Sequence, residues 1–447
     1  MTQAEQTIAQ SMAGNILAFS GRGFGAETLD HARAAILDTI GVTLAGSRHP
    51  AVELLLDAVS LSALPGVARV FGRDITLNPL DAALLNGMAG HVLDFDDANS
   101  HLHGHASVVI LPVILALADQ RGADAATILR AYVTGYEACA RMGDAVGRRQ
   151  YTLGWHPTTS IGIFGAAAAA AVMLELDVDA TAMALVIAAS HASGIKSNFG
   201  TPTKPLMVGQ AARNALMAAL LAERGFTGGK AAFEHPQGYF AVYNGAPENW
   251  TSTPLTEPWT GVPRIDDREK SIQFKRYPCC YALAAPIDGI LELRTRENID
   301  PAAIAHVSVA VHPIRFPHID IPKPETPFAA KFSATYCVAR ALVGGTIVLD
   351  DFEEAGRFDD PLTRQIMERT ELVRHEDSVT NRAFVTIRMA DGHEYHIDVA
   401  QPLGATYANP LPVEVLREKF IACAGRVPGL DPAAYYARLS TEIGGKA

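Results

Sequence analysis

A short stretch between two apolar segments, residues 91–112, carries three carboxylates and four histidines. It begins His-Val-Leu-Asp-Phe-Asp-Asp and ends His-Leu-His-Gly-His-Ala-Ser-Val-Val-Ile-Leu-Pro. Ionisable groups packed this densely beside apolar residues lose solvation free energy unless they are paired or take part in chemistry. We therefore expect acid–base catalysis at this segment.

The histidines of this stretch allow two interpretations. His101, His103 and His105 alternate along the chain, so an extended backbone would point them the same way and could form a metal site, as in a metal-dependent hydrolase. No ligand pattern elsewhere in the sequence completes such a site, so we expect no metal. The interpretation we favour is one catalytic base, His105, because Ala106 and Ser107 lead into an apolar helix whose N-terminus favours neutral imidazole.

Two further segments place polar side chains where a helix begins. His156 precedes Pro157 and an apolar run, so it is a second candidate for proton transfer; a structural histidine fits the pattern equally well. Lys204 precedes Pro205, which we expect to open a helix. There the ammonium and the helix N–H groups would bind a carboxylate, and a solvated surface lysine is the alternative.

Residues 274–280, Phe-Lys-Arg-Tyr-Pro-Cys-Cys, put two cations at the end of a possible strand and two thiols at a helix start. Lys275 and Arg276 are candidates to bind carboxylates. Cys280 is a candidate contact for the substrate; either thiol could act as a nucleophile, although packing explains buried cysteines more often. The sequence has no phosphate-loop or dinucleotide fingerprint, so we expect no cofactor.

Helical and strand patterns divide the chain. Apolar residues at three- and four-residue spacing predict helices at 29–45, 79–92, 108–120, 125–146, 180–190, 206–224, 280–296, 328–343, 361–374, 412–424 and 432–442. Alternation predicts strands around 307–311, 383–389 and 394–399, the last two flanking the hairpin signal Asp391-Gly392. The fold class is therefore mainly α with an inserted α+β domain: a large helical domain, 1–267 and 403–447, and a smaller α/β domain, 268–402.

Composition excludes several classes of partner. The formal net charge is −11 and the chain has no Lys/Arg run, which argues against nucleic acid and against an anionic membrane surface. The five cysteines are scattered without a Cys-x-x-Cys spacing, and the first residues lack the order of a signal peptide. The longest apolar run, 161–174, is too short to span a bilayer. We expect a cytoplasmic protein.

Six segments in this order resemble the MmgE/PrpD family: Leu-Asp-Phe-Asp-Asp at 93–97, Gly-His-Ala-Ser at 104–107, Gly-Trp-His-Pro at 154–157, Thr-Lys-Pro-Leu at 203–206, Phe-Lys-Arg-Tyr-Pro at 274–278 and Phe-Ser-Ala-Thr-Tyr at 332–336. The resemblance implies a helical domain with an α/β lid, usually in a homodimer, with the active site in the cleft between them and no metal or cofactor. The family includes 2-methylcitrate dehydratase, cis-aconitate decarboxylase and iminodisuccinate epimerase.

The resemblance implies catalytic or binding roles for Asp94, His105, His156, Lys204, Lys275 and Tyr336. In this view Lys204, Lys275 and Arg276 hold carboxylates, Asp94 orients a histidine or binds the substrate, and Tyr336 donates a proton from the lid. Two positions depart from the decarboxylase pattern: Ala98 replaces a threonine and Cys280 replaces a histidine.

The sequence departs from the dehydratase pocket as well, so the first choice is an epimerase of the iminodisuccinate type, acting on a small anionic di- or tricarboxylate. The alternatives are a dehydratase, a hydro-lyase similar to 2-methylcitrate dehydratase, and a cis-aconitate-type decarboxylase. A carboxylate-binding protein without catalysis is a further alternative.

Overall fold

The computed structural model describes residues 6–353 and 357–444, which divide into two compact units. The helical unit takes the described parts of Met1–Val92, Asp96–Gln273 and Pro412–Ala447. The α/β unit takes Leu93–Phe95 and Phe274–Leu411. The sequence placed the inserted domain at 268–402 and did not anticipate that three residues near position 94 belong to it. A hinged lid motion stays a prediction.

The helical unit holds most of the predicted helices, with ends within a few residues of those expected. Its helices are α1 (Ile8–Ser20), α2 (Ala26–Gly46), α3 (Pro50–Ser60), α4 (Pro79–His91), α5 (Ser107–Arg121), α6 (Ala125–Val146), α7 (Arg149–Leu153), α8 (Pro157–Ser160), α9 (Gly162–Met173), α10 (Val178–His191), α11 (Thr203–Glu223), α12 (Tyr239–Asn244), α13 (Thr253–Thr256), α19 (Val413–Ala424) and α20 (Pro432–Glu442). Two short strand pairs, β1 (Ala68–Arg69) with β2 (Thr76–Leu77) and β3 (Ala98–Asn99) with β4 (Ile272–Gln273), complete it.

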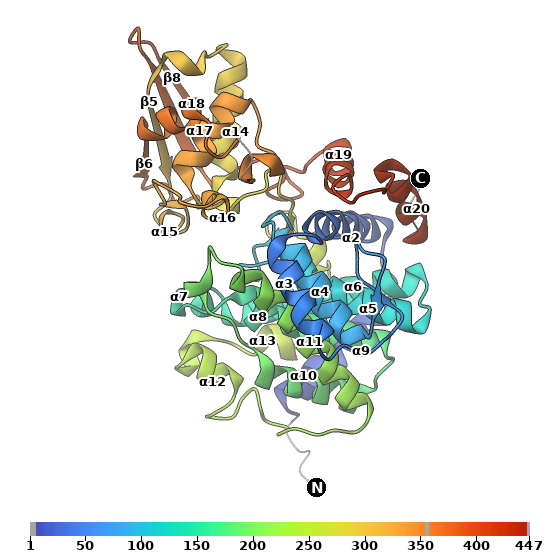
Figure 1. Ribbon diagram of the computed structural model, residues 1–447. Helices are drawn as coiled ribbons and strands as arrows, with labels where there is room; N and C mark the ends of the chain where they lie inside the picture. Colours follow the sequence, from blue (N-terminus) through green and yellow to red (C-terminus); the bar gives the residue numbers. More distant parts are fainter. Residues whose placement is uncertain (1–5, 354–356, 445–447) are drawn as a thin grey trace. The chain divides into compact units, whose positions relative to one another are not determined.

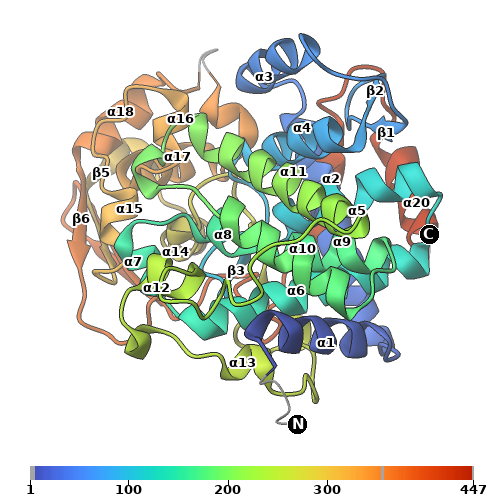
Figure 2. The ribbon, with the colours of Figure 1, turned by 90° about the horizontal axis from the view of Figure 1, so that it is seen from below.

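Helices α4 and α11 lie side by side, with α10 next to α11 (Figure 2). Helix α4 begins where the Asn78 side chain accepts hydrogen bonds from two backbone N–H groups of its first turn. A Cβ atom added at Gly87 of α4 would lie 2.9 Å from the Cα atom of Gly209 of α11, so this contact requires glycine. The close approach sets the distance between the end of α4 and the start of α11.

The α/β unit is built on one four-stranded sheet with the order β6-β5-β7-β8. Its strands are β5 (Ile304–Val311), β6 (Thr370–Arg374), β7 (Ala383–Met389) and β8 (Glu394–Val399), and its helices are α14 (Ala284–Arg296), α15 (Phe316–Ile319), α16 (Pro327–Ala330), α17 (Ala334–Gly344) and α18 (Pro361–Glu368). Figure 1 shows α14, α17 and α18 on one face of the sheet. The predicted hairpin is confirmed: β7 and β8 are antiparallel, and Gly392 between them has a φ of 91°.

Three helix predictions in this unit were wrong in part. The helix expected at 361–374 ends at Glu368, and Thr370–Arg374 forms β6, parallel to β5. The helix expected at 328–343 is interrupted, because Ser333 caps α17 by accepting a hydrogen bond from the Tyr336 N–H. The helix expected from Cys280 starts at Ala284, after a 3₁₀ turn.

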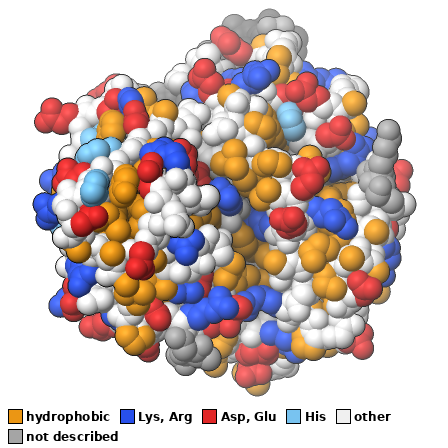
Figure 3. All heavy atoms as spheres, turned by 90° about the horizontal axis from the view of Figure 1, so that it is seen from above, with side chains coloured by type: hydrophobic (Ala, Val, Ile, Leu, Met, Phe, Trp, Pro, Cys, Tyr) orange, Lys and Arg blue, Asp and Glu red, His pale blue; other side chains and the backbone are white. Residues whose placement is uncertain are grey.

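The apolar lengths of the helices and the charges on the surface agree with what the composition indicated. None of the helices in the described residues is long and apolar enough to cross a membrane. On the face drawn in Figure 3, lysine and arginine side chains alternate with aspartate and glutamate rather than gathering into one basic field. All five cysteines are free thiols.

Candidate active site

His105 lies on the loop before α5, and the backbone of that loop is fixed on α8. The His105 N–H donates to the hydroxyl of Thr158 at 3.1 Å, and a Cβ atom at Gly104 would come 2.8 Å from the Thr158 nitrogen. The Nδ1 atom of His105 lies 2.6 Å from the carbonyl oxygen of Asp97 and 3.1 Å from Oδ2 of Asp96. A carbonyl oxygen only accepts, so Nδ1 carries the proton and Nε2 keeps its lone pair. His105 therefore has the tautomer that a general base needs.

Asp96 is fully buried, and the rings of His91 and His105 both face its carboxylate. The Nδ1 atom of His91 lies 3.0 and 2.9 Å from its two oxygens. Burial alone would raise the pKa of Asp96, but attraction to His91 and His105 and hydrogen bonds from both rings outweigh it and hold that pKa well below its usual range. Burial also lowers the pKa of His91 to about 4, although Asp96 opposes this. At neutral pH the pair is thus a carboxylate beside a neutral imidazole.

His156 and Lys204 belong to the same cluster. The His156 ring centroid lies 6.0 Å from that of His91 and 4.9 Å from that of Phe199. The Lys204 Nζ atom lies 5.1 Å from the centre of the Phe199 ring. Both His156 and Lys204 are buried, and the Lys204 charge helps to lower the pKa of His91. Three imidazoles, one carboxylate and one ammonium therefore gather where α4, α5, α8 and α11 begin or end.

The structure contradicts the proposed metal cluster of His101, His103 and His105. Among the described residues, the group of side chains close enough to share an ion is His91, Asp96 and His105, with ligand atoms within 4.8 Å of one another. In that group the Nδ1 atoms of both histidines face Asp96 and carry protons, so these rings could bind an ion only through their Nε2 atoms. A protonated nitrogen cannot ligate a metal.

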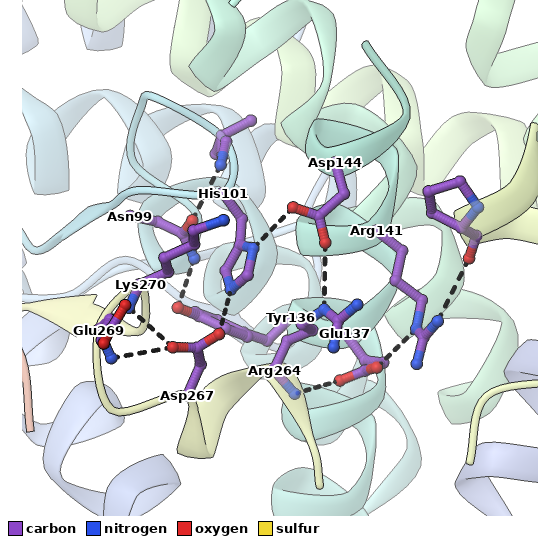
Figure 4. Close-up of polar contacts among 12 residues, drawn as sticks. Asn99, His101, Tyr136, Glu137, Arg141, Asp144, Arg264, Asp267, Glu269 and Lys270 are labelled. Carbon is purple, nitrogen blue, oxygen red and sulfur yellow. Dashed lines mark hydrogen bonds and ion pairs between the residues drawn. The ribbon is translucent and has the colours of Figure 1, made fainter. Parts of the chain in front are cut away.

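His101 has a structural position instead. Its Nδ1 atom lies 2.8 Å from a carboxylate oxygen of Asp144, and its Nε2 atom lies 3.6 Å from Asp267 (Figure 4). Asp144 also binds the Arg264 guanidinium at 3.1 Å, and the Arg264 N–H donates to Glu137. This network ties the His101 loop to α6 and to the segment before β4. The His101 side chain is thus bound through Nδ1 to Asp144, while Nε2 faces Asp267 without a hydrogen bond among the described residues.

The α/β unit holds the remaining predicted residues. Asp94 has a φ of 53°, unusual for a residue with a side chain. The Lys275 ammonium lies 3.1 Å from the Asp94 carboxylate and donates to the Asp94 carbonyl at 2.6 Å. The fully buried Lys331 donates to the carbonyls of Leu93 at 2.9 Å and Pro278 at 3.1 Å. Burial lowers the pKa of Lys331 to about 8. Two lysines thus hold Leu93–Phe95 in this unit.

Three further predicted residues lie in this unit, and their roles stay predictions. Tyr336 is fully buried, and its hydroxyl donates to the carbonyl of Asp351, so the structure gives it a core position. Arg276 is exposed and pairs with Asp288 at 3.2 Å, so its charge is already compensated. Cys280 is partly buried, and its N–H donates to the Lys331 carbonyl.

Sequence reasoning missed His91, Asp96 and Lys331. His91 and Asp96 stood in the segment singled out first, but the resemblance pointed to Asp94. One local signal existed for His91. It follows Gly87 by four residues, so both lie on the same face of α4, and Gly87 is where α4 contacts α11. No comparable signal marks Lys331, because its burial depends on long-range packing.

Comparison with known proteins gives the family. The model of the MmgE/PrpD N-terminal domain matches residues 11–250, and that of the C-terminal domain matches residues 277–436. The chain belongs to the MmgE/PrpD family, as the sequence motifs predicted. It is similar to the cis-aconitate decarboxylase of Homo sapiens, with 27% identity over 419 residues that cover 90% of this chain and 85% of the relative. The enzyme of the same name from Mus musculus is 27% identical over 447 residues, with 94% and 88% covered. That from Aspergillus terreus is 28% identical over 435 residues, with 90% and 86% covered.

Proposed function

We propose that this protein is a lyase that acts on a small di- or tricarboxylate at the carbon next to a carboxylate. The observation that carries the proposal is the His105 imidazole, whose Nδ1 faces both Asp96 and the Asp97 carbonyl while Nε2 keeps its lone pair. Relatives named cis-aconitate decarboxylase favour a lyase of the decarboxylase or dehydratase kind over the epimerase that was the first choice from sequence.

The cluster supplies what both lyase reactions need. Proton removal puts a positive charge on His105, which the Asp96 carboxylate stabilises, and leaves negative charge on the substrate, which Lys204 offsets. In a dehydration, the electron pair of the broken C–H bond forms the double bond as the oxygen leaves. In a decarboxylation, the C–C bond breaks, carbon dioxide leaves, and the electron pair of that bond stays on the substrate; His105, which in this route must first take up a proton from water, donates that proton to the carbon. His156 is the second proton-transfer group.

Neither route uses a metal or an organic cofactor. Lys275 pairs with Asp94 within the α/β unit, and its carboxylate-binding role stays a prediction from the sequence. The homodimer and the cytoplasmic location expected from the sequence stay predictions.

Proton NMR in deuterated water tests the proposal directly. The purified protein is incubated with cis-aconitate, citrate, 2-methylcitrate and malate, one at a time. A decarboxylase gives a product with one carboxylate fewer and deuterium at the new C–H bond, and a dehydratase gives a vinyl proton signal. Exchange or inversion at carbon without loss of carbon dioxide or water would show an epimerase and contradict the lyase proposal.

A further inference from the structure

His91 has one ring nitrogen without a hydrogen-bond partner. Its Nδ1 atom is bound to Asp96 at 2.9 Å, so the proton lies on that nitrogen and Nε2 carries a lone pair. Nε2 is buried and has no hydrogen-bond partner among the described residues. Buried polar atoms are nearly always paired, and one left unpaired costs the desolvation free energy of the group. The atom is thus an acceptor that lacks a donor.

The surroundings of the ring place this acceptor in the candidate active site. The His91 ring lies 4.7 Å from the His105 ring and 6.0 Å from the His156 ring, measured between centroids. Because burial lowers the pKa of His91 to about 4, the ring is neutral at physiological pH and Nε2 stays an acceptor. The Lys204 charge is near enough to act on His91, but no hydrogen bond joins the two.

We propose that Nε2 of His91 accepts a hydrogen bond from a hydroxyl or amino group of the substrate. The proposal rests on the proposed function and narrows its substrate class. A carboxylate group offers only acceptors, so it would meet the His91 lone pair with repulsion. A hydroxyl or amino group on a carbon of the substrate supplies the missing donor. Within the proposed function, the inference favours dehydration of a hydroxy- or amino-substituted di- or tricarboxylate over decarboxylation of an acid that carries carboxylates alone, such as cis-aconitate.

Matched ligand pairs test this inference by calorimetric binding at pH 7.5. Malate and aspartate are each compared with succinate, and citrate is compared with tricarballylate, so the members of a pair differ in one hydroxyl or amino group. The wild type is expected to bind the donor-bearing member at least tenfold more tightly. The malate and aspartate arms distinguish a hydroxyl from an amino substrate.

Two substitutions of His91 distinguish loss of the Nε2 acceptor from loss of the folded site. In His91→Asn the amide nitrogen replaces Nδ1, so the bond to Asp96 is kept and the acceptor is lost; the preference should fall to within twofold. In His91→Gln the amide oxygen replaces Nε2, so the acceptor is restored and part of the preference should return. Binding of succinate and tricarballylate should stay within threefold in both variants, which shows that the site is folded.

The outcomes are distinguishable. If the carboxylates bind but the wild type shows no preference, or if His91→Asn keeps the full preference, this inference is wrong and the proposed function stands. If none of the carboxylates binds to the wild type, the proposed function fails and the inference with it.

Discussion

One carboxylate oxygen of Asp96 lies 3.1 Å from Nδ1 of His105. Asp96 is fully buried, so its negative charge is screened little by water and acts strongly on the imidazole. The carboxylate fixes the tautomer of His105 and stabilises the imidazolium that forms when Nε2 takes a proton. Asp96 is therefore a positioning residue for the base.

We expect Asp96→Asn to lower kcat by about 100-fold or more, because the uncharged amide no longer stabilises the imidazolium. The acid limb of the pH–rate profile should move to lower pH, since the base holds its proton less tightly. Steady-state kinetics between pH 5 and 9 measure both effects. Asp144→Asn, which breaks the His101 pair, is the matched control: it should lower the thermal midpoint and leave the acid limb in place. An unmoved acid limb in Asp96→Asn would contradict the role.

His105→Gln keeps a polar side chain of similar size and removes the titratable base. The turnover number should fall by about 100-fold or more while KM changes little, because the base acts in the transition state. His101→Gln is the comparison, since His101 is paired with Asp144 and Asp267. If His101→Gln abolished turnover and His105→Gln did not, the base would be misassigned.

Lys204→Met keeps the length of the side chain and removes its charge. Because we expect this charge to attract a substrate carboxylate in the ground state and in the transition state alike, KM should rise and kcat/KM should fall. Lys204→Arg should recover part of the affinity. Unchanged KM in Lys204→Met would place the carboxylate elsewhere.

The stability of the protein should fall as the pH drops from about 6.5 to about 4. His91 takes a proton near pH 6.5 when unfolded but near pH 4 when folded, so protons favour the unfolded state in this window. Full loss corresponds to ~3 kcal/mol for this one residue. Thermal midpoints at pH 7 and pH 4.5 measure the loss, and His91→Asn should show a smaller difference between the two. An equal difference in both proteins would contradict the assignment.

Turnover should survive prolonged treatment with EDTA. This expectation comes from the sequence, in which no ligand pattern elsewhere completes a metal site. Loss of activity with EDTA, followed by recovery on adding a divalent metal, would contradict this expectation and point to the group of His91, Asp96 and His105 as its ligands.

Local sequence patterns predicted much of the fold. The helices at 125–146 and 432–442 and the hairpin strands at 383–389 and 394–399 have the predicted bounds, because periodicity and capping residues determine them locally. Strand β6 was missed because its five residues follow α18 almost directly and do not alternate regularly between buried and exposed positions. A strand without that alternation is recognised only from its pairing in the sheet.

The candidate site was predicted in part. His105, His156 and Lys204 were named from their positions at helix starts, and the structure brings them together. His91 and Asp96 become visible only once α4 packs on α11 and the loop folds back so that both imidazoles meet one carboxylate. Tyr336 was named from a motif, and motifs do not distinguish a core hydroxyl from a catalytic one.

The placement of Leu93–Phe95 has a consequence for any attempt to dissect this protein. A polypeptide that joins Gln273 directly to Pro412 would delete the α/β unit together with Lys275 and Lys331, the two donors that hold the Leu93 and Asp94 carbonyls. The deletion would release the short span that connects His91 to Asp96. Exchange of the α/β unit between relatives therefore requires the transfer of two separate pieces of sequence, one of them only three residues long.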